Sequence, residues 1–581
     1  MSKIIKIHEN LHKIPENSIL HKNNRVYLTI GRHRVSLENG RFRSDPDRVC
    51  VGVAQLDRNG NPTGMFYANE TYHIYCCEGE KPLPPDRADS LTIGPRILFE
   101  NVCEKYDLIK ILNDVFGKQD TNLILDLSMY MITERTAVFQ RFPLWAKRNL
   151  LFSSEIRSDS YVSNFLENSL SYSKIKLFLS SWGKRHINSG GVYFCYDSTN
   201  VNSQAEGVYI VQKGHAKDDP SLPQINTDYV IRQEDGLPLI FSDFPGSIVD
   251  MHEAKQIIKF LSEISKETPI TVICDRGYIS EENIDDMREN GISYILMLKS
   301  NSKDYKYLME TYFDQLDNKF DKYIPEYNSY AMTVKHKLFS KGKENYFHLI
   351  LNKKTEPKQL NVLAGEINNR TKLIHSYINR KKPVCEKELN DLSKWHDLDV
   401  KESGTLILED KRSKSGNVTV PAYIINSCKE SNNKIEKYLK RCGFYIIVSS
   451  DNINYIEALK AYSKRDIIEK TFMVLKSSLG MDKFGVSSEN RMHGKSLIWF
   501  IASIIYSIIF SSTKSLRVKD TKNFTFNSMI ERIKGIVADR DFKIKKYQRR
   551  YRLDSKQKKI FDIFSIEEND VDKIVSNMKY Y

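Results

Sequence analysis

The chain has 581 residues, enough for roughly four domains of about 150 residues each, which excludes a lone small module. Lys and Arg total 88 against 74 Asp and Glu, a formal net charge of +14. Hydrophobic residues make up 40% and charged residues 28%, as in globular proteins, which excludes a disordered or collagen-like chain. The positive charge favours a polyanionic partner: DNA, RNA or an anionic membrane surface.

The cysteines and the apolar runs predict a cytoplasmic protein without a membrane partner. The nine cysteines are scattered and include no CxxC pair, which is typical of reduced thiols rather than of a disulfide or zinc framework. The polar N-terminus lacks the apolar core of a secretion signal. The longest apolar run, 497–510, contains two serines and is shorter than the about 20 residues that span a bilayer, so we expect a buried helix there.

The first two parts of the chain differ in pattern. Residues 1–95 combine short β-like runs with turn signals such as Asn59-Gly60-Asn61-Pro62, which predicts a small N-terminal module. From 96 to 188, apolar residues recur at steps of three and four, which predicts a helical domain.

The pattern changes again after Gly191, where an apolar run leads to Asp197 and predicts a strand buried on both faces. Strand-like segments follow at 229–233, 237–244, 270–274 and 292–299, with helical segments from Met251 and from Ser280. For residues 189–300 this order of three strands, helix, strand, helix and strand predicts an α/β mixed sheet that opens with a meander.

The rest of the chain is predicted in three parts. Residues 301–442 alternate β-like runs with charged stretches, which indicates a β-rich insertion. Residues 443–495 begin with a strand that returns to the sheet and continue with one long helix over 455–480. Residues 496–581 are expected to form a helical, increasingly basic C-terminal region.

Two aspartates stand out because each directly follows the apolar residues of a predicted core strand. Asp197 follows Tyr196, and Asp275 follows Cys274. A charged carboxylate against a core strand is costly unless it is paired, protonated or bound to a cation. The alternative for each site is a turn or helix-capping aspartate just past the strand, a common role for this residue.

A third acidic residue belongs to a polar row on the long predicted helix. The row is separated by steps of 3, 4 and 7, which place its members on one helix face: Tyr462, Arg465, Glu469 and Lys476. An adjoining apolar stripe is expected to pack on the sheet: Ile468, Phe472, Leu475 and Leu479. The alternative is that Arg465 and Glu469 form an ordinary surface pair at i,i+4.

Bringing Asp197, Asp275 and Glu469 together creates repulsion that divalent cations remove. All-oxygen ligation suits Mg²⁺, or Mn²⁺, rather than zinc. Two such ions about 3.5–4 Å apart activate an attacking water or 3′-hydroxyl and stabilise the leaving oxygen of a phosphodiester. The three carboxylates therefore predict phosphoryl transfer on nucleic acid.

At these residues the chain resembles the DDE transposases of bacterial insertion sequences, in the group marked by Tyr-x2-Arg-x3-Glu-x6-Lys. The motif is complete, from Tyr462 to Lys476. Supporting segments are YDSTN around Asp197, GHAKDDPSLPQI from Gly214, DFPGSIVD from Asp243 and DRGYISEEN around Asp275. The resemblance covers about 190–495, roughly half of the chain.

The resemblance implies an RNase H-like catalytic core with Asp197, Asp275 and Glu469 as its catalytic and metal-binding triad. It implies that Tyr462, Arg465 and Lys476 hold the DNA strand near the scissile phosphate. Members of this family excise an element from double-stranded DNA at its terminal inverted repeats and join it to target DNA, usually as a homodimer in a synaptic complex. A β-rich insertion before the glutamate helix is also a feature of the family.

The flanking regions give weaker predictions. The stretch 542–559 is basic with interleaved aromatic residues, a pattern that follows a phosphate backbone, and its candidate DNA-binding residues are Lys545, Lys546, Arg549 and Arg550. The alternative is a solvated basic helix. The N-terminal module carries several arginines near its β-like runs and is a candidate for binding the ends of the element.

The function predicted from the sequence is a Mg²⁺-dependent DNA transposase that cleaves and rejoins strands in the cytoplasm, at the nucleoid. A structure-selective nuclease on the same fold is one alternative, and a non-catalytic DNA-binding protein derived from a transposase is another. An RNA-binding protein is supported only by the charge.

Overall fold

The computed structural model describes residues 11–36, 42–76, 87–187, 193–205, 207–214, 222–248, 250–265, 268–339, 342–409, 417–481, 483–541 and 544–579. It divides into two compact units, 1–89 and 90–580. The predicted module boundary at residue 95 therefore lies slightly too late, because β6 (Ser90–Thr92) pairs with a C-terminal strand of the second unit. Most of the GHAKDDPSLPQI segment, residues 215–221, lies outside the described residues.

The first unit is built on an antiparallel sheet with strand order β1-β5-β4-β3-β2. Its elements are β1 (Leu11–Lys13), β2 (Ser18–Leu20), β3 (Arg25–Ser36), β4 (Phe42–Leu56), β5 (Pro62–Ala68) and α1 (Glu70–Cys76). Its own small core includes Val26, Val51 and Phe66, each fully buried. This core is separate from that of the second unit, so the N-terminal module is stabilised by its own hydrophobic core.

The second unit begins with a helical region that follows β6. Its helices are α2 (Gly94–Lys105), α3 (Leu108–Phe116), α4 (Lys118–Glu134), α5 (Phe142–Ala146), α6 (Asp159–Asn168) and α7 (Tyr172–Ile187). They pack around α16 (Glu489–Ser512), which contacts α4, α6 and α2. By length and composition α16 is the described helix apolar enough to cross a membrane, but 83% of that window is buried inside the protein. It serves here as the core helix.

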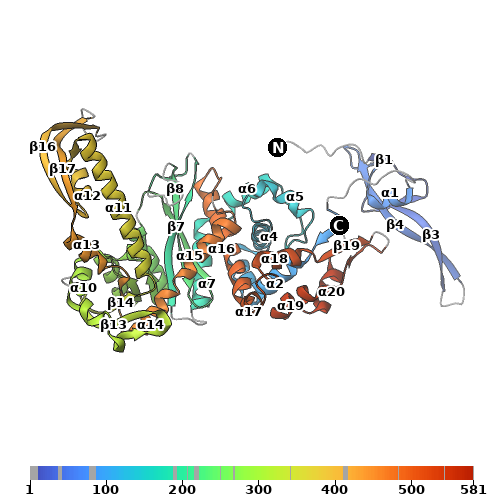
Figure 1. Ribbon diagram of the computed structural model, residues 1–581. Helices are drawn as coiled ribbons and strands as arrows, with labels where there is room; N and C mark the ends of the chain where they lie inside the picture. Colours follow the sequence, from blue (N-terminus) through green and yellow to red (C-terminus); the bar gives the residue numbers. More distant parts are fainter. Residues whose placement is uncertain are drawn as a thin grey trace. The chain divides into compact units, whose positions relative to one another are not determined.

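The centre of the second unit is a mixed sheet with the order β12-β13-β14-β18-β11-β10-β7-β8-β9 (Figure 1). The predicted succession of strands and helices is confirmed as β7 (Tyr193–Asn202), β8 (Gln224–Arg232), β9 (Pro238–Pro245), α8 (Asp250–Ile264), β10 (Thr271–Cys274), α9 (Glu281–Glu289) and β11 (Ser293–Met297), with β18 (Phe444–Ser449) returning to it. β7, β10 and β11 run parallel, and β8 and β9 form the antiparallel meander. All residues of β8 and β10 are buried, so both sheet faces are covered.

The stretch predicted as a β-rich insertion is partly helical, and some of its strands belong to the central sheet. Its elements are α10 (Lys303–Leu316), β12 (Tyr323–Ile324), β13 (Ser329–Lys337), β14 (Glu344–Asn352), α11 (Glu356–Arg380), β15 (Val384–Cys385), α12 (Glu386–Leu392), β16 (His396–Glu409), β17 (Asn417–Glu430) and α13 (Asn432–Leu439). β12 to β14 extend the central sheet. Only β15, β17 and β16 form a separate small sheet, along which α11 lies (Figure 1).

The single long helix predicted over 455–480 is in fact two helices, α14 (Tyr455–Ser463) and α15 (Asp466–Ser478). At the break, the amides of Arg465, Ile467 and Ile468 each bond to the carbonyl three residues earlier, which tightens the chain into a turn. The predicted apolar stripe of α15 is confirmed, since Ile468, Leu475 and Leu479 are fully buried. The ring of Phe472 meets Tyr229 of β8 edge-on at 5.8 Å.

The C-terminal region is not wholly helical, contrary to the prediction. It contains α17 (Lys514–Lys519), α18 (Phe526–Lys534), β19 (Val537–Asp541), β20 (Lys546–Arg549), α19 (Ser555–Ile563) and α20 (Glu568–Asn577). β19 and β20 form a hairpin that pairs with β6. The physical reason is long-range pairing: β6 lies hundreds of residues earlier in the chain, and it supplies backbone partners that no local pattern shows.

Candidate active site

Strand register places two of the three predicted carboxylates side by side. β7 and β10 are parallel neighbours, and their pairing ends with Tyr196 opposite Cys274. Asp197 directly follows Tyr196, and Asp275 directly follows Cys274. Neighbouring strands lie about 4.8 Å apart, so the two aspartates lie side by side where β10 ends, a place termed here the sheet edge.

Asp197 does not close its strand as predicted, because β7 continues to Asn202 and pairs Asp197 with Tyr229 of β8. The turn or capping alternative is therefore wrong for Asp197. Its Oδ1 accepts a hydrogen bond from the amide of Ser198 at 2.9 Å. The alternative holds for Asp275, which caps the short 3₁₀ turn Arg276–Tyr278 and accepts from the amide of Arg276 at 2.7 Å.

Arg465 links the sheet edge to α15. One guanidinium nitrogen lies 3.4 Å from Oδ2 of Asp197, and another lies 2.6 Å from Oε1 of Glu469. Arg465 and Glu469 do form the i,i+4 pair that the alternative predicts. Arg465 is only 15% exposed, however, and it also contacts the carboxylate of Asp197 on β7. Burial acts to lower the pKa of Arg465, yet the surrounding acidic groups, Asp275, Asp197 and Glu469 among them, raise it on balance.

Tyr462 reaches the other aspartate, since its hydroxyl lies 3.5 Å from Oδ1 of Asp275. Burial raises the pKa of Tyr462 above its ordinary value, and the positive charge of Arg465 opposes the shift only in part. The phenol therefore stays protonated at neutral pH and acts as a hydrogen-bond donor toward the carboxylates.

Two contacts that the sequence did not predict fix α14 on the sheet and so position Tyr462. The side-chain amide of Gln233, just after β8, donates to the carbonyl of Ala461 at 2.7 Å. The hydroxyl of Tyr193 on β7 donates to Glu457 at 3.0 Å. Each contact joins distant parts of the chain through a single polar residue, which gives no spacing pattern to detect.

Lys476 lies further along α15, seven residues after Glu469. It is half-buried and lines a cavity between the helical region and the end of α15. The polar row thus divides: Tyr462 and Arg465 contact the aspartates of the sheet, Glu469 joins them through Arg465, and Lys476 lines the cavity.

The donor set fits a hard divalent cation in kind, because it consists of carboxylate oxygens. Among the described residues, however, no three His, Cys, Asp or Glu side chains lie close enough together to hold a metal ion. The guanidinium of Arg465 lies between Asp197 and Glu469, where a bridging cation would neutralise the same charges. Metal binding therefore requires Arg465 to exchange its partners.

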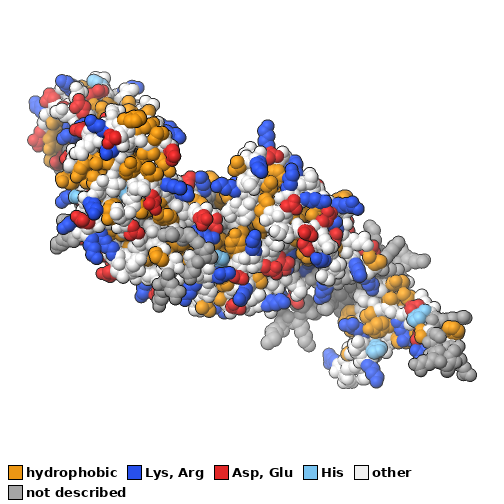
Figure 2. Space-filling model, turned by 90° about the horizontal axis from the view of Figure 1, so that it is seen from below, with side chains coloured by type: hydrophobic (Ala, Val, Ile, Leu, Met, Phe, Trp, Pro, Cys, Tyr) orange, Lys and Arg blue, Asp and Glu red, His pale blue; other side chains and the backbone are white. Residues whose placement is uncertain are grey.

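The basic C-terminal residues occupy a different setting. Arg549 pairs with Glu568 at 2.9 Å and Asp572 at 3.3 Å, and Arg550 pairs with Asp539 at 2.6 Å. Lys546 is exposed on β20, and Lys545 has a positive φ of 52° at the turn before it. Figure 2 shows Lys and Arg side chains spread over the visible face with acidic residues among them, so charge alone marks no DNA-binding surface there.

Residues 189–505 match the family model described as the transposase DDE domain. This range is more than half of the chain, and the protein therefore belongs to the DDE transposase family. No curated protein sequence matches the chain. The solved structures that match include a cryo-EM structure of a piggyBac transposase synaptic complex with hairpin DNA, with a TM-score of 0.32 and 10% identity, covering 75% of this chain and 70% of that chain.

Proposed function

We propose that this protein is a divalent-metal-dependent DNA transposase with an RNase H-like core, which cleaves DNA at the terminal inverted repeats of an insertion sequence and transfers the cut strand to target DNA. The observation that carries this proposal is the register of β7 and β10. It aligns Asp197 with Asp275 at the point where Arg465 and Tyr462 meet the sheet. Such adjacent carboxylates are costly unless cations neutralise them.

The proposed roles follow from the contacts of each residue. Asp197, Asp275 and Glu469 hold Mg²⁺ or Mn²⁺. When bound, a pair of such ions activates the attacking hydroxyl and stabilises the leaving oxygen of the phosphodiester. Once Arg465 releases its carboxylates, its guanidinium is free to clamp a phosphate through two parallel hydrogen bonds. The neutral phenol of Tyr462 donates a hydrogen bond at the same place, and Lys476 attracts the strand that leads away from it.

The partners belong to the same proposal. The substrate is double-stranded DNA, both the ends of the element and the target. Two copies of the chain are proposed to act together in a synaptic complex in the cytoplasm, at the nucleoid. Binding of the element's ends by residues 1–89 is supported only by that unit's separate core and its arginines.

Replacing Glu469 with Gln tests the proposal, because it removes one anionic ligand while keeping the size of the side chain. DNA from both borders of the coding region supplies the substrate, with Mg²⁺ present. We expect E469Q to lose cleavage and strand transfer and to retain binding in a gel-shift assay. The matched control is D466N, which removes a carboxylate on the same helix that is 54% exposed and pairs with Lys470.

Three outcomes of this experiment would each contradict part of the proposed function. Cleavage by E469Q at the rate of D466N would refute the catalytic assignment. Cleavage by the unmodified protein without joining of a 3′-hydroxyl donor to target DNA would indicate a structure-selective nuclease. Binding of the border DNA without metal-dependent cleavage would indicate a non-catalytic DNA-binding protein.

A further inference from the structure

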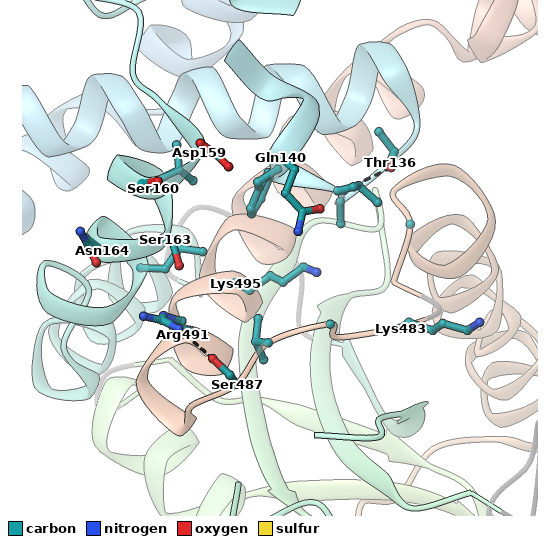
Figure 3. A pocket seen from close by; sticks show the side chains of 18 of the residues that line it. Thr136, Gln140, Asp159, Ser160, Ser163, Asn164, Lys483, Ser487, Arg491 and Lys495 are labelled. Carbon is teal, nitrogen blue, oxygen red and sulfur yellow. Dashed lines mark hydrogen bonds between the residues drawn. The ribbon is translucent and has the colours of Figure 1, made fainter. Parts of the chain in front are cut away.

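A large cavity opens at the C-terminal end of α15, within the second unit. Its volume is about 1140 Å³, above the roughly 300–1,000 Å³ typical of small-molecule pockets. Its walls come from three segments that are distant in the chain: 135–140 after α4, 159–166 of α6, and 476–495 from the end of α15 into α16. Figure 3 shows the cavity from close by.

The charged side chains that line the cavity are mostly cationic. Five of the lining side chains are basic, against one acidic residue, Asp159: Arg135, Lys476, Lys483, Arg491 and Lys495. Lys495 is only 6% exposed and donates to the carbonyl of Phe484. Arg491 also pairs with Glu167 at 3.0 Å, whereas Arg135 and Lys483 are exposed. The excess of positive charge in a hollow favours an anionic occupant.

Neutral hydrogen-bonding groups lie among these cations. Gln140, Ser160, Ser163 and Asn164 line the cavity together with the ring of Phe139. In Figure 3, Lys495 extends across the middle of the cavity, with Gln140 on one side and Arg491 and Ser487 on the other. Amides, hydroxyls and an aromatic ring are the groups that contact unpaired bases, and cations are those that contact phosphates.

Helix α15 connects the candidate active site to the cavity. Lys476, which lines the cavity, follows Glu469 by seven residues, about 10 Å at 1.5 Å per residue, a distance that one or two nucleotides of an extended strand can span. Gly480 fixes the end of this helix against the cavity wall. It has a φ of +68°, and a Cβ there would lie 2.8 Å from the amide nitrogen of Ala137. The distance between the two sites is therefore set by rigid elements.

We propose that this cavity binds a single strand of the DNA substrate, within a few nucleotides of the scissile phosphate. The phosphates lie along Arg135, Lys476 and Lys483, and the bases face Phe139 and the polar residues of α6. This proposal rests on the proposed function, since it takes the strand held at the carboxylates as its occupant. A duplex fits this arrangement poorly, because its bases are paired and turned inward and could not reach the neutral side chains.

Binding of a fluorescent 12-nucleotide oligo-dT, followed by anisotropy in EDTA, tests the proposal without catalysis. The test variant is the double substitution R135Q/K483Q, which removes the two exposed cations. Its control is K184Q/K306Q, which removes two exposed lysines outside the cavity. We expect the test variant to bind about 5- to 10-fold more weakly and to lose about 1.4 from the slope of log affinity against log salt, since each single-strand phosphate contact contributes about 0.7. The control should match the unmodified protein.

Oligonucleotides that carry 4-thiothymidine give a second readout that does not depend on affinity. On irradiation we expect cross-links to peptides that contain residues 135–140 or 159–166. Cross-links confined to other peptides, or equal affinity of the test and control variants, would overturn the proposal. An equal loss for a 12-base-pair duplex would make the cavity a duplex surface, and displacement of the oligonucleotide by equimolar dTMP would make it a mononucleotide pocket; either result overturns it.

The binding experiment also separates this proposal from the proposed function. Oligonucleotide binding in the cavity by a protein that never cleaves DNA would contradict the transposase activity alone. Metal-dependent cleavage that R135Q/K483Q leaves intact, together with unchanged binding and with cross-links confined to peptides outside the cavity, would contradict the cavity alone.

Discussion

Two places in the second unit hold a largely buried arginine between carboxylates, and they differ in how their charges add up. At the sheet edge, Arg465 is 15% exposed and contacts Asp197 and Glu469, with Asp275 beside them through the strand register. At the C-terminal hairpin, Arg549 is 12% exposed and contacts Glu568 and Asp572. Burial and pairing distance alone therefore do not distinguish the two places.

The charge balance does distinguish them. The sheet edge has three carboxylates for one guanidinium. The hairpin has three cations for three carboxylates, because Arg550 pairs with Asp539 and Lys558 pairs with Glu568. In a balanced cluster the positive and negative charges are equal in number, so the cluster stabilises local structure without a further ion. At the sheet edge, strand register holds two carboxylates together, and one guanidinium leaves an excess of negative charge that a further cation would offset. The comparison is consistent with the proposed metal site at the first place and with a structural role at the second.

The largest expected effect is at the aspartates of the sheet edge. We expect D197N and D275N each to reduce single-turnover cleavage by at least about 10³-fold, since loss of a metal ligand removes several kcal/mol of transition-state stabilisation. The double variant should be no slower than the worse single variant, because residues that act as a unit are not additive. D539N, which removes a carboxylate from the balanced hairpin, should stay within about twofold of the unmodified protein. A similar loss in D539N would break the comparison.

Arg465 gives the next effect, which is measured on metal binding. In R465Q the carboxylates lose the cation that occupies them, so a divalent ion no longer competes with it. We expect the rise in melting temperature with Mg²⁺ to reach its midpoint at about tenfold lower Mg²⁺ than in the unmodified protein, equal to about 1.4 kcal/mol by linkage. Differential scanning fluorimetry measures this directly.

The control for this experiment is R550Q, which removes an arginine from the balanced hairpin. It should lower the melting temperature slightly and leave the Mg²⁺ midpoint unchanged. A midpoint that moves equally in R465Q and R550Q, or that rises in R465Q, would show that Arg465 does not occupy the cation position.

Much of the core could be predicted because its signals are local. Short apolar runs mark the strands of the central sheet, and the motif from Tyr462 to Lys476 marks the third carboxylate. The continuation of β7 past Asp197 was missed because its residues are polar. Ser198, Thr199 and Asn200 are nevertheless buried, and Asn200 bonds to Gln224 on the neighbouring strand at 3.0 Å. Such partners make a buried polar strand stable, but they are invisible until the strands are paired.

Other features depend on contacts that spacing does not encode. Helix α11 was missed because it buries only Leu363, Ile367 and Ile374 along its length, a stripe too narrow to show against charged neighbours. The break at Arg465 was missed because no proline or glycine marks it. The approach of Arg465 to Asp197 needs both the break and the strand register, so spacing along the chain could not predict this contact.

A smaller effect is expected for DNA binding by the hairpin. Arg549 and Arg550 already face carboxylates, so R549Q/R550Q should change affinity for duplex DNA by less than about twofold and leave the salt slope unchanged. K545Q/K546Q changes the other two predicted DNA-binding residues, of which Lys546 is exposed. That variant should bind a few-fold more weakly and reduce the slope by up to about 1.8, since each duplex phosphate contact contributes about 0.9.

Titrations of fluorescent duplex at several salt concentrations measure both quantities. The K184Q/K306Q variant serves again as the control for the loss of two cations. A reduced slope in R549Q/R550Q would mean that these arginines leave their carboxylates for phosphates, and the hairpin would then no longer count as purely structural.

The smallest effect concerns the stability of the hairpin in acid. The hydrogen bond from Arg550 is the main cause that lowers the pKa of Asp539 below its ordinary 3.8, with Ser90 adding to it. A carboxylate with a lowered pKa contributes stability that is present above pH 3.8 and is lost as the pH falls through its folded-state value. Because the pair is largely exposed, D539N should cost under about 1 kcal/mol at pH 7. Amide hydrogen exchange of Val537–Asp541 in both proteins should therefore differ at pH 7 and converge as the pH falls below 3.8. A difference that stays constant or grows on acidification would mean that the ion pair does not hold the hairpin, and the balance of charge there would be incidental.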